Sequence, residues 1–226
     1  MNLHIISPLL YVAFVKLIQY IKPCPTSEVM LKYRLRHNIF LSILSLFMLL
    51  GITYGNFITN KLSSLENLLC LPYDNDLVSV LSVWTFLYSK YLEWGDTLFL
   101  HLSGKKISYL QYTHHMTTAI LMYSNLADYI SPHIYIFMSL NCFVHIFMYW
   151  YFAYPKGMLY KIRKLITQMQ IVQHVICIST IVHTMRLDNC EQNKYGNKLG
   201  LLMYLMYLFY FIVFYINSYR DKKLKS

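Results

Sequence analysis

The sequence predicts an all-α polytopic membrane protein, on three observations. Of its 226 residues, 57% are hydrophobic and only 13% are charged, which is far from the profile of a soluble domain. The apolar residues fall in successive runs close to the roughly 20 residues that a helix needs to cross the hydrocarbon core. The runs are continuous and too long for spanning strands, which would alternate. Because no repeat or low-complexity linker divides the chain, a single domain over residues 1–226 is expected.

Seven runs qualify as candidate spans. In chain order they cover residues 3–21, 38–57, 77–102, 109–125, 133–153, 165–185 and 199–219. The first run has a signal peptide as its alternative interpretation, but it lacks a basic start, and no small-x-small cleavage site precedes Lys22. It is therefore predicted to be retained as a helix, giving seven transmembrane helices.

The basic residues predict the orientation of the chain. Connections after spans two, four and six contain only Lys61, Arg186, Lys194 and Lys198, and two more lysines lie within spans. The other fourteen of the 20 Lys and Arg follow spans one, three and five or lie in the tail. By the positive-inside rule, the N-terminus faces the lumen or the exterior and the C-terminus faces the cytoplasm. The formal net charge of +10 is thus assigned to orientation, lipid headgroups and an anionic ligand, and not to nucleic acid.

The five cysteines show no metal-ligand spacing such as C-x-x-C, so no zinc site is predicted. Cys70 and Cys190 fall in connections on the predicted non-cytoplasmic side, where disulfides persist, whereas Cys24 faces the reducing side. Two interpretations fit this distribution. Either Cys70 and Cys190 are bridged, or both are free lumenal thiols.

Ionisable residues inside spans are costly and usually face a cavity or one another, so each is a candidate for function. The stretch "SKYLEWGDTLFL" places Lys90, Glu93, Asp96 and Thr97 in the third span. Residues three and four apart share a helix face, where Lys90 and Glu93 can neutralise each other. The pair either fixes helix packing or contacts a substrate directly.

The next span opens with "LQYTHHMTTAI", in which Gln111, His114 and His115 fall at i, i+3 and i+4. Gln111 therefore shares a face with both histidines, whereas the two histidines diverge by about 100° around the helix axis. One histidine can face a partner helix while the other reaches a reacting group. A lone buried histidine would more often be a hydrogen-bonded core residue.

Two further polar stripes lie on the fifth and sixth spans. The first contains Asn141, His145, Met148, Tyr149 and Phe152, and the second contains Thr167, Gln170, Gln173 and His174. Interhelical hydrogen bonding explains either stripe alone. The occurrence of polar clusters on four consecutive spans instead favours a shared site.

At these residues the chain resembles the ELO-type fatty acid elongases, the membrane condensing enzymes of very-long-chain fatty acid synthesis. Its residues match four motifs of that family in order: K-x-x-E-W-x-D-T at Lys90, Glu93, Trp94, Asp96 and Thr97; H-x-x-H-H at Gln111, His114 and His115; N-x-x-x-H-x-x-M-Y-x-Y at Asn141, His145, Met148, Tyr149 and Tyr151; and T-x-x-Q-x-x-Q at Thr167, Gln170 and Gln173. The resemblance covers nearly the whole chain. One departure is Gln111, which replaces the first histidine of its box, as in some elongases that act on polyunsaturated substrates.

The resemblance implies a 3-oxoacyl-CoA synthase, an acyltransferase that condenses a long-chain acyl-CoA with malonyl-CoA and releases carbon dioxide and CoA. Both thioesters are substrates, and neither a cofactor nor a metal is expected. Spans two to seven are expected to form a six-helix barrel around an acyl tunnel, with span one peripheral. The family also implies the endoplasmic reticulum membrane and the reductases and dehydratase of the elongation cycle as partners, and it allows a homodimer. The tail "KKLKS" suggests reticulum retention, although its lysines are one position out of the dilysine frame.

Condensation requires an acyl acceptor on the enzyme and stabilisation of the enolate that malonyl-CoA leaves on losing carbon dioxide. Burial favours a neutral imidazole, so His114 is expected to be the nucleophile that forms an acyl-imidazole. His145 is expected to orient malonyl-CoA and either to stabilise the enolate or to handle a proton, with His115, Asn141 and Gln111 as orienting groups. The expected substrate-contacting residues are Lys90, Glu93, Asp96, Thr97, Gln111, Tyr149, Thr167, Gln170 and Gln173.

Two other classes of protein remain as alternatives. A membrane di-iron desaturase or hydroxylase also carries histidine boxes, but it needs roughly eight histidine ligands. This chain has nine histidines, of which His4, His37 and His133 lie outside the spans or at their ends. A non-catalytic seven-helix receptor or lipid carrier fits the span count, but it does not explain ionisable residues at one depth on four adjacent spans.

Overall fold

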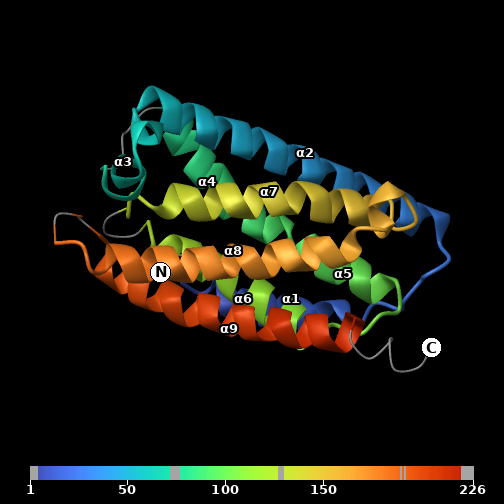
Figure 1. Ribbon diagram of the computed structural model, residues 1–226. Coiled ribbons are helices and arrows are strands. Elements are labelled where there is room, and N and C mark those ends of the chain that lie inside the picture. Colours follow the sequence, from blue (N-terminus) through green and yellow to red (C-terminus); the bar gives the residue numbers. More distant parts are fainter. Residues whose placement is uncertain (1–4, 72–76, 127–129, 189, 191, 220–226) are drawn as a thin grey trace.

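The computed structural model describes residues 5–71, 77–126, 130–188, 190 and 192–219, and these residues form helices and turns without strands. The α-helices of this part are α1 (Ser7–Ile18), α2 (Glu28–Ile58), α3 (Leu65–Cys70), α4 (Leu77–Leu92), α5 (Trp94–Leu102), α6 (Tyr109–Ser124), α7 (Ile134–Ala153), α8 (Arg163–Thr184) and α9 (Lys194–Tyr219). Figure 1 shows an elongated bundle along which α2, α7, α8 and α9 run. The all-α prediction is confirmed, while the start of the first predicted span and the "KKLKS" tail lie outside the described residues.

Four of the described helices, α2, α7, α8 and α9, are long and apolar enough to cross a membrane. The other predicted spans correspond to shorter helices. The predicted third span is divided into α4 and α5 by one residue, Glu93. There the Asp96 N–H donates to the Glu93 carbonyl oxygen at 3.0 Å, an i+3 bond that tightens the turn.

Helix α2 begins ten residues before the predicted second span. Ser27 caps it, with its hydroxyl accepting a hydrogen bond from the Met30 N–H at 3.3 Å. The first turns carry Lys32, Arg34 and Arg36, which are good helix formers but interrupt the apolar run. Hydropathy alone therefore placed the start of this helix too late.

The helices pack through apolar contacts and small residues. One core cluster joins α2, α4, α6 and α7 and includes Ile52, Leu87 and Met138. Helix α2 approaches α4 closely at Gly51, where a Cβ atom would come within 2.7 Å of the Ser82 hydroxyl. Small residues that allow such close approach are typical of helix contacts in membranes.

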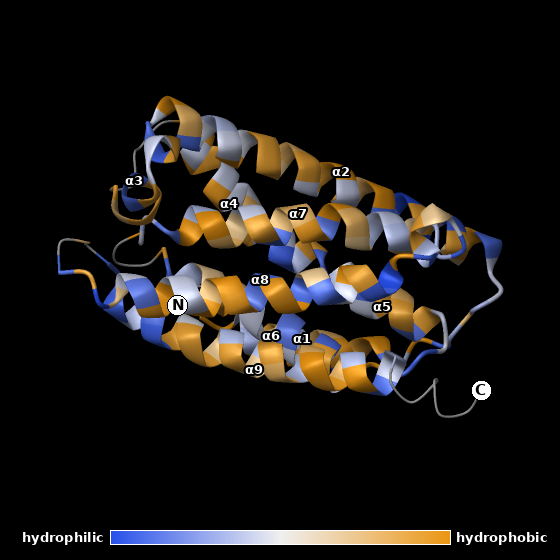
Figure 2. Cartoon of the chain, viewed as in Figure 1, coloured by the Kyte–Doolittle hydropathy of each residue, from blue (hydrophilic) through white to orange (hydrophobic). Residues whose placement is uncertain are grey.

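Large apolar side chains also cover the outside of the bundle. Figure 2 shows hydrophobic residues along most of α2 and α9. Phe47 and Leu50 on α2 and Leu202 and Phe209 on α9 are more than half exposed. Exposed apolar surface of this extent is typical of a face in contact with lipid.

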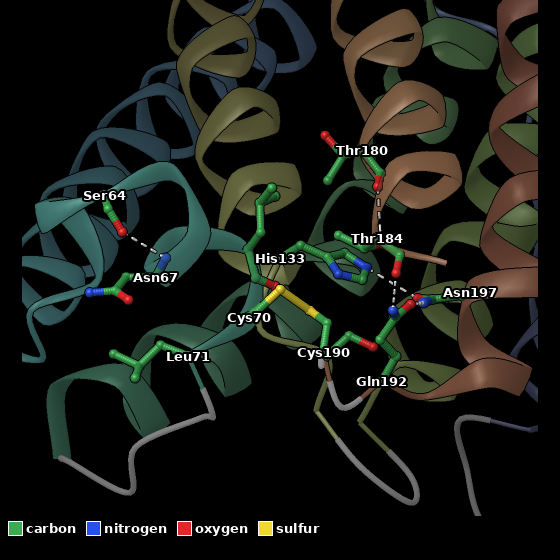
Figure 3. The surroundings of a disulfide bond; sticks show 12 residues. Ser64, Asn67, Cys70, Leu71, His133, Thr180, Thr184, Cys190, Gln192 and Asn197 are labelled. Carbon is green, nitrogen blue, oxygen red and sulfur yellow. Dashed lines mark hydrogen bonds between the residues drawn. A yellow bond between two sulfur atoms is a disulfide. The ribbon is translucent and has the colours of Figure 1, made fainter. Parts of the chain in front are cut away.

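The two ends of the bundle differ in chemistry. At one end, here called the disulfide end, Cys70 at the end of α3 is bonded to Cys190 in the connection between α8 and α9. Figure 3 shows His133 beside this bond, with its Nε2 atom 3.1 Å from Asn197 Oδ1. The Asn197 amide donates to Gln192 Oε1 at 2.7 Å, and the Gln192 amide donates to the Thr184 carbonyl oxygen. The opposite end, here called the basic end, carries Arg34 and Lys105.

The disulfide is expected to stabilise the fold, because it constrains the unfolded chain over a separation of 120 residues. Replacing Cys70 and Cys190 together by serine should lower stability by about 2–4 kcal/mol. Thermal unfolding in detergent measures this loss, and reductant should move the wild-type protein to the same midpoint. The matched control is Cys24→Ser, since Cys24 is a free thiol. Unchanged unfolding in reductant would contradict this role of the bond.

Candidate functional site

A buried ion pair lies at the junction between α4 and α5. Lys90 Nζ donates to Glu93 Oε1 at 2.8 Å, and the two side chains are 4% and 2% exposed. The same ammonium donates to Asn141 Oδ1 on α7 at 2.9 Å and lies 4.1 Å from the Phe86 ring centroid. A charge buried this deeply needs a partner, and each member of the pair provides it for the other.

The ion pair fixes the orientation of Asn141 and, through it, the proton position on His145. An ammonium only donates, so the Asn141 oxygen must face Lys90 and its amide nitrogen must face His145. That Nδ2 atom lies 3.2 Å from His145 Nε2, which therefore accepts. A neutral His145 then carries its proton on Nδ1, which points to Glu93 Oε1 at 3.6 Å.

The paired histidines lie on α6, as the sequence predicted, and face different surroundings. Ser108 caps this helix by accepting from the Gln111 N–H at 3.1 Å. His115 is buried, and its carbonyl oxygen accepts from Trp94 Nε1 at 3.2 Å. The His114 ring packs edge-on against Tyr207 of α9, with the centroids 5.1 Å apart. His114 Nδ1 is buried and has no hydrogen-bond partner among the described residues.

His114, Lys90 and Asn141 line one narrow cavity of about 50 Å³. Its α6 wall continues from His114 through Thr118, Leu121 and Met122 to Asn125, and its α7 wall contains Asn141, Met138, Phe137 and Ile134. The eleven residues of α6 from His114 to Ser124 extend about 16 Å. The cavity therefore runs from a polar region around Lys90 toward the disulfide end, along mainly apolar walls.

Asp96 and Gln111 lie away from this cavity, at the basic end. They line a second pocket of about 250 Å³ together with Arg34 and Lys105. Asp96 Oδ2 accepts a hydrogen bond from the Tyr149 hydroxyl at 2.9 Å. Gln111 Nε2 donates to the hydroxyl of Thr97 at 3.3 Å.

The stripe on α8 is only partly brought to the site. Gln173 lines the cavity beside His174, whereas Gln170 Nε2 contacts Met148 Sδ at 3.4 Å. The Thr167 hydroxyl lies 3.4 Å from both the Arg163 carbonyl oxygen and the Tyr219 hydroxyl. Thr167 therefore ties α8 to α9 and does not line the cavity.

Sequence reasoning missed three contributors to this region. Tyr11 of α1 is fully buried, with its hydroxyl 2.8 Å from Thr97 Oγ1 and its ring against Trp94 and His115. Helix α1, which was expected to be peripheral, thus contributes to the surroundings of the histidine pair. Tyr207 and His37 are the other two, and none of the three belongs to a periodic motif that would have identified it.

The described histidines and carboxylates do not converge as a metal centre would require. Within the described ranges, no group of three or more His, Cys, Asp or Glu side chains is placed to hold a metal ion. The polar groups instead pair with one another through nitrogen and oxygen atoms. The chemistry that this arrangement offers directly is that of imidazoles beside an amide and an ion pair.

Fold and site together define an all-helical protein with several apolar helices, as in a multi-pass membrane protein, enclosing a histidine-containing polar cluster. The chain belongs to the ELO family: the sequence model of the GNS1/SUR4 family matches residues 1–226.

Proteins similar to this chain carry the names of fatty acid elongases. Fatty acid elongase A of Dictyostelium discoideum is 32% identical over 195 residues, covering 82% of this chain and 71% of the relative. Fatty acid elongase 2 of Trypanosoma brucei brucei is 29% identical, covering 64% of this chain and 58% of the relative. Long chain fatty acid elongase 1 of Caenorhabditis elegans is 33% identical, covering 61% and 50%. The chain thus spans about half the length of the latter two.

The buried ion pair gives a stability prediction. Lys90→Met leaves the Glu93 carboxylate buried without its cation and should cost about 3–5 kcal/mol. The double variant Lys90→Met/Glu93→Leu removes both charges and should be more stable than Lys90→Met alone. Thermal unfolding in detergent compares the two. If the double variant unfolds at or below the midpoint of the single variant, Glu93 is not the group that Lys90 neutralises.

Proposed function

We propose that this protein is a fatty acid elongase of the 3-oxoacyl-CoA synthase type, which condenses a long-chain acyl-CoA with malonyl-CoA through an acyl-imidazole on His114. The observation that carries the proposal is the placement of His114. It lines a narrow cavity with mainly apolar walls, has a buried ring nitrogen without a partner among the described residues, and shares this cavity with Lys90 and Asn141. Membership of the ELO family and the names of the relatives support the same reaction class.

In the first step, a ring nitrogen of neutral His114 attacks the thioester carbonyl carbon of the acyl-CoA. The new C–N bond replaces the C–S bond, and CoA leaves as a thiol with the proton that the imidazole gives up. The apolar walls beyond His114 then receive the acyl chain. Met122 and Met138 line this path, and their flexible side chains can move apart as the chain enters.

In the second step, malonyl-CoA loses carbon dioxide, and the remaining enolate carbon attacks the acyl carbonyl on His114. The C–N bond breaks, 3-oxoacyl-CoA leaves, and the departing imidazolate takes up one proton from solvent, the proton that the overall condensation consumes, to restore neutral His114. Negative charge develops on the thioester oxygen of the enolate, so donors near that atom accelerate the step. Asn141 is the proposed donor, because it lines the cavity beside Lys90 and its amide has a second N–H besides the one directed at His145 Nε2. His145 is proposed to hold this amide and to orient malonyl-CoA.

The basic-end pocket is the proposed position of the CoA portions. Arg34 and Lys105 supply positive charge there, which suits phosphate groups. Lys90 is the less suitable phosphate partner, because it is 3% exposed and already bonded to Glu93 and Asn141. Its proposed role is to hold the cluster, and its effect on the substrate passes through Asn141.

The proposed setting is the membrane of the endoplasmic reticulum, with the basic end cytoplasmic and the disulfide end lumenal. In that setting α4 and α5 cross together as one span, α1 and α6 are short spans, and α2 to α9 enclose the acyl tunnel as a barrel. Acyl-CoA and malonyl-CoA would reach the site from the cytoplasm. The reductases and dehydratase of the elongation cycle would take up the 3-oxoacyl product.

The reaction is tested with labelled malonyl-CoA and a panel of acyl-CoA substrates on the full-length protein in microsomes. His114→Ala should abolish CoA release from acyl-CoA alone, since the acyl acceptor is gone. His145→Ala should retain that release but slow condensation by about 10²- to 10⁴-fold. The double variant should be no slower than His114→Ala, because the two residues act in one sequence.

The matched control is His183→Ala, since this exposed histidine lies toward the disulfide end, away from the cavity. It should retain both activities. Full incorporation of malonyl carbon by His114→Ala would exclude the acyl-imidazole. A trapped acyl adduct on a side chain other than histidine would exclude it as well.

A further inference from the structure

His37 on α2 makes a contact that could not be predicted from its position in the sequence. Its Nε2 atom lies 3.0 Å from Asp96 Oδ1 on α5, across 59 residues of chain. The ring packs against Phe99, with centroids 5.2 Å apart, and against Gly95. A Cβ atom on Gly95 would lie 2.5 Å from His37 Cε1, so any larger residue at position 95 would displace the His37 ring.

The second oxygen of the same carboxylate is also used. Asp96 Oδ2 accepts from the Tyr149 hydroxyl at 2.9 Å, and the Asp96 side chain is only 9% exposed. A carboxylate this enclosed requires donors on its oxygens. With His37 on one oxygen and Tyr149 on the other, its plane has a single favourable orientation.

Tyr149 connects the Asp96 carboxylate to His145. It is 1% exposed, and its ring meets the His145 ring edge-on with centroids 5.2 Å apart. His145 in turn contacts Asn141 and Glu93. An unbroken series of contacts therefore joins His37 at the basic end to the imidazole proposed for the condensation step.

We propose that His37 is a positioning residue for condensation: it holds the Asp96 carboxylate, which orients Tyr149 against His145. This role rests on the proposed function, because it assigns His37 to the half-reaction of malonyl-CoA. The contacts lead to His145 and not to His114, which packs on Tyr207 and lines the cavity. Loss of His37 therefore slows condensation and leaves acyl loading in place.

Three variants separate this role from simple packing. His37→Leu keeps an apolar side chain but cannot donate to Asp96. His37→Gln retains an N–H that reaches the carboxylate, so it is the conservative rescue. Gly95→Ala leaves His37 unchanged but pushes its ring off Asp96. The matched control is His101→Gln, because His101 lies at the same end and contacts the Ile21 carbonyl oxygen at 2.8 Å.

Two rates are measured on the full-length protein. CoA release from acyl-CoA alone reports loading, and incorporation of labelled malonyl carbon reports condensation. His37→Leu and Gly95→Ala should each lower kcat for condensation by about tenfold or more, the effect of losing a hydrogen bond to a charged group. Loading should change by less than about twofold, and His37→Gln and His101→Gln should both stay near wild type. The double variant His37→Leu/Gly95→Ala should be no slower than His37→Leu, because both changes break one contact.

Wild-type condensation by His37→Leu would overturn the inference, as would equal losses of loading and condensation or a failure of His37→Gln to restore the rate. Thermal unfolding in detergent shows whether each variant is folded. If His37→Leu is not folded, the loading and condensation rates of Gly95→Ala are compared with those of the wild type instead. The wild-type protein decides the proposed function separately. If the wild-type protein condenses but releases no CoA from acyl-CoA alone, the acyl-imidazole is excluded, and the condensation rates of the variants relative to wild type still test the role of His37. If the wild-type protein does not condense, both proposals are wrong.

Discussion

The need to pair charge inside an apolar bundle governs the arrangement of this site. Lys90 and Glu93 lie at the junction of α4 and α5, almost fully buried, where an isolated charge would cost several kcal/mol. Pairing gives one oxygen of the carboxylate a proton of the ammonium and leaves another proton for Asn141 on α7. That second bond sets the amide orientation and hence which nitrogen of His145 accepts. One ion pair thus determines the protonation pattern of a histidine on another helix.

The two ends of the bundle differ in their side-chain contacts and in the pockets beside them. At the disulfide end, Cys70–Cys190 and the side-chain bonds among His133, Asn197 and Gln192 tie the connections together. At the basic end, a larger pocket lies beside Arg34 and Lys105. The cavity lined by His114 extends from the ion pair toward the disulfide end. A ligand with a polar head and a long apolar chain would therefore place its head on the basic-end side of His114 and its chain on the disulfide-end side.

Local spacing predicted the parts of the site that lie within one helix. The i, i+3 pairing of Lys90 with Glu93 and the placement of His114 and His115 on one helix follow from periodicity, and both are present. Contacts between distant segments left no such pattern: His37 with Asp96, 59 residues apart, and Tyr11 with Thr97, 86 apart. Helix ends were missed for a different reason. Hydropathy records transfer to lipid, so it neither includes the charged first turns of α2 nor detects the interruption at Glu93.

The same geometry explains why glutamine can stand first in the histidine box. Gln111 Nε2 donates to Thr97 Oγ1, which also bonds the Tyr11 hydroxyl, so this position supplies an N–H donor between α6 and α5. A neutral imidazole offers an N–H of the same kind, and the glutamine amide replaces that function without any need for a titratable ring. Gln111 lines the basic-end pocket, whereas His114, nearly one turn further along α6, lines the apolar cavity. In this chain the first position of the box thus supplies an N–H donor to Thr97 of α5, and it lies apart from the cavity that His114 lines.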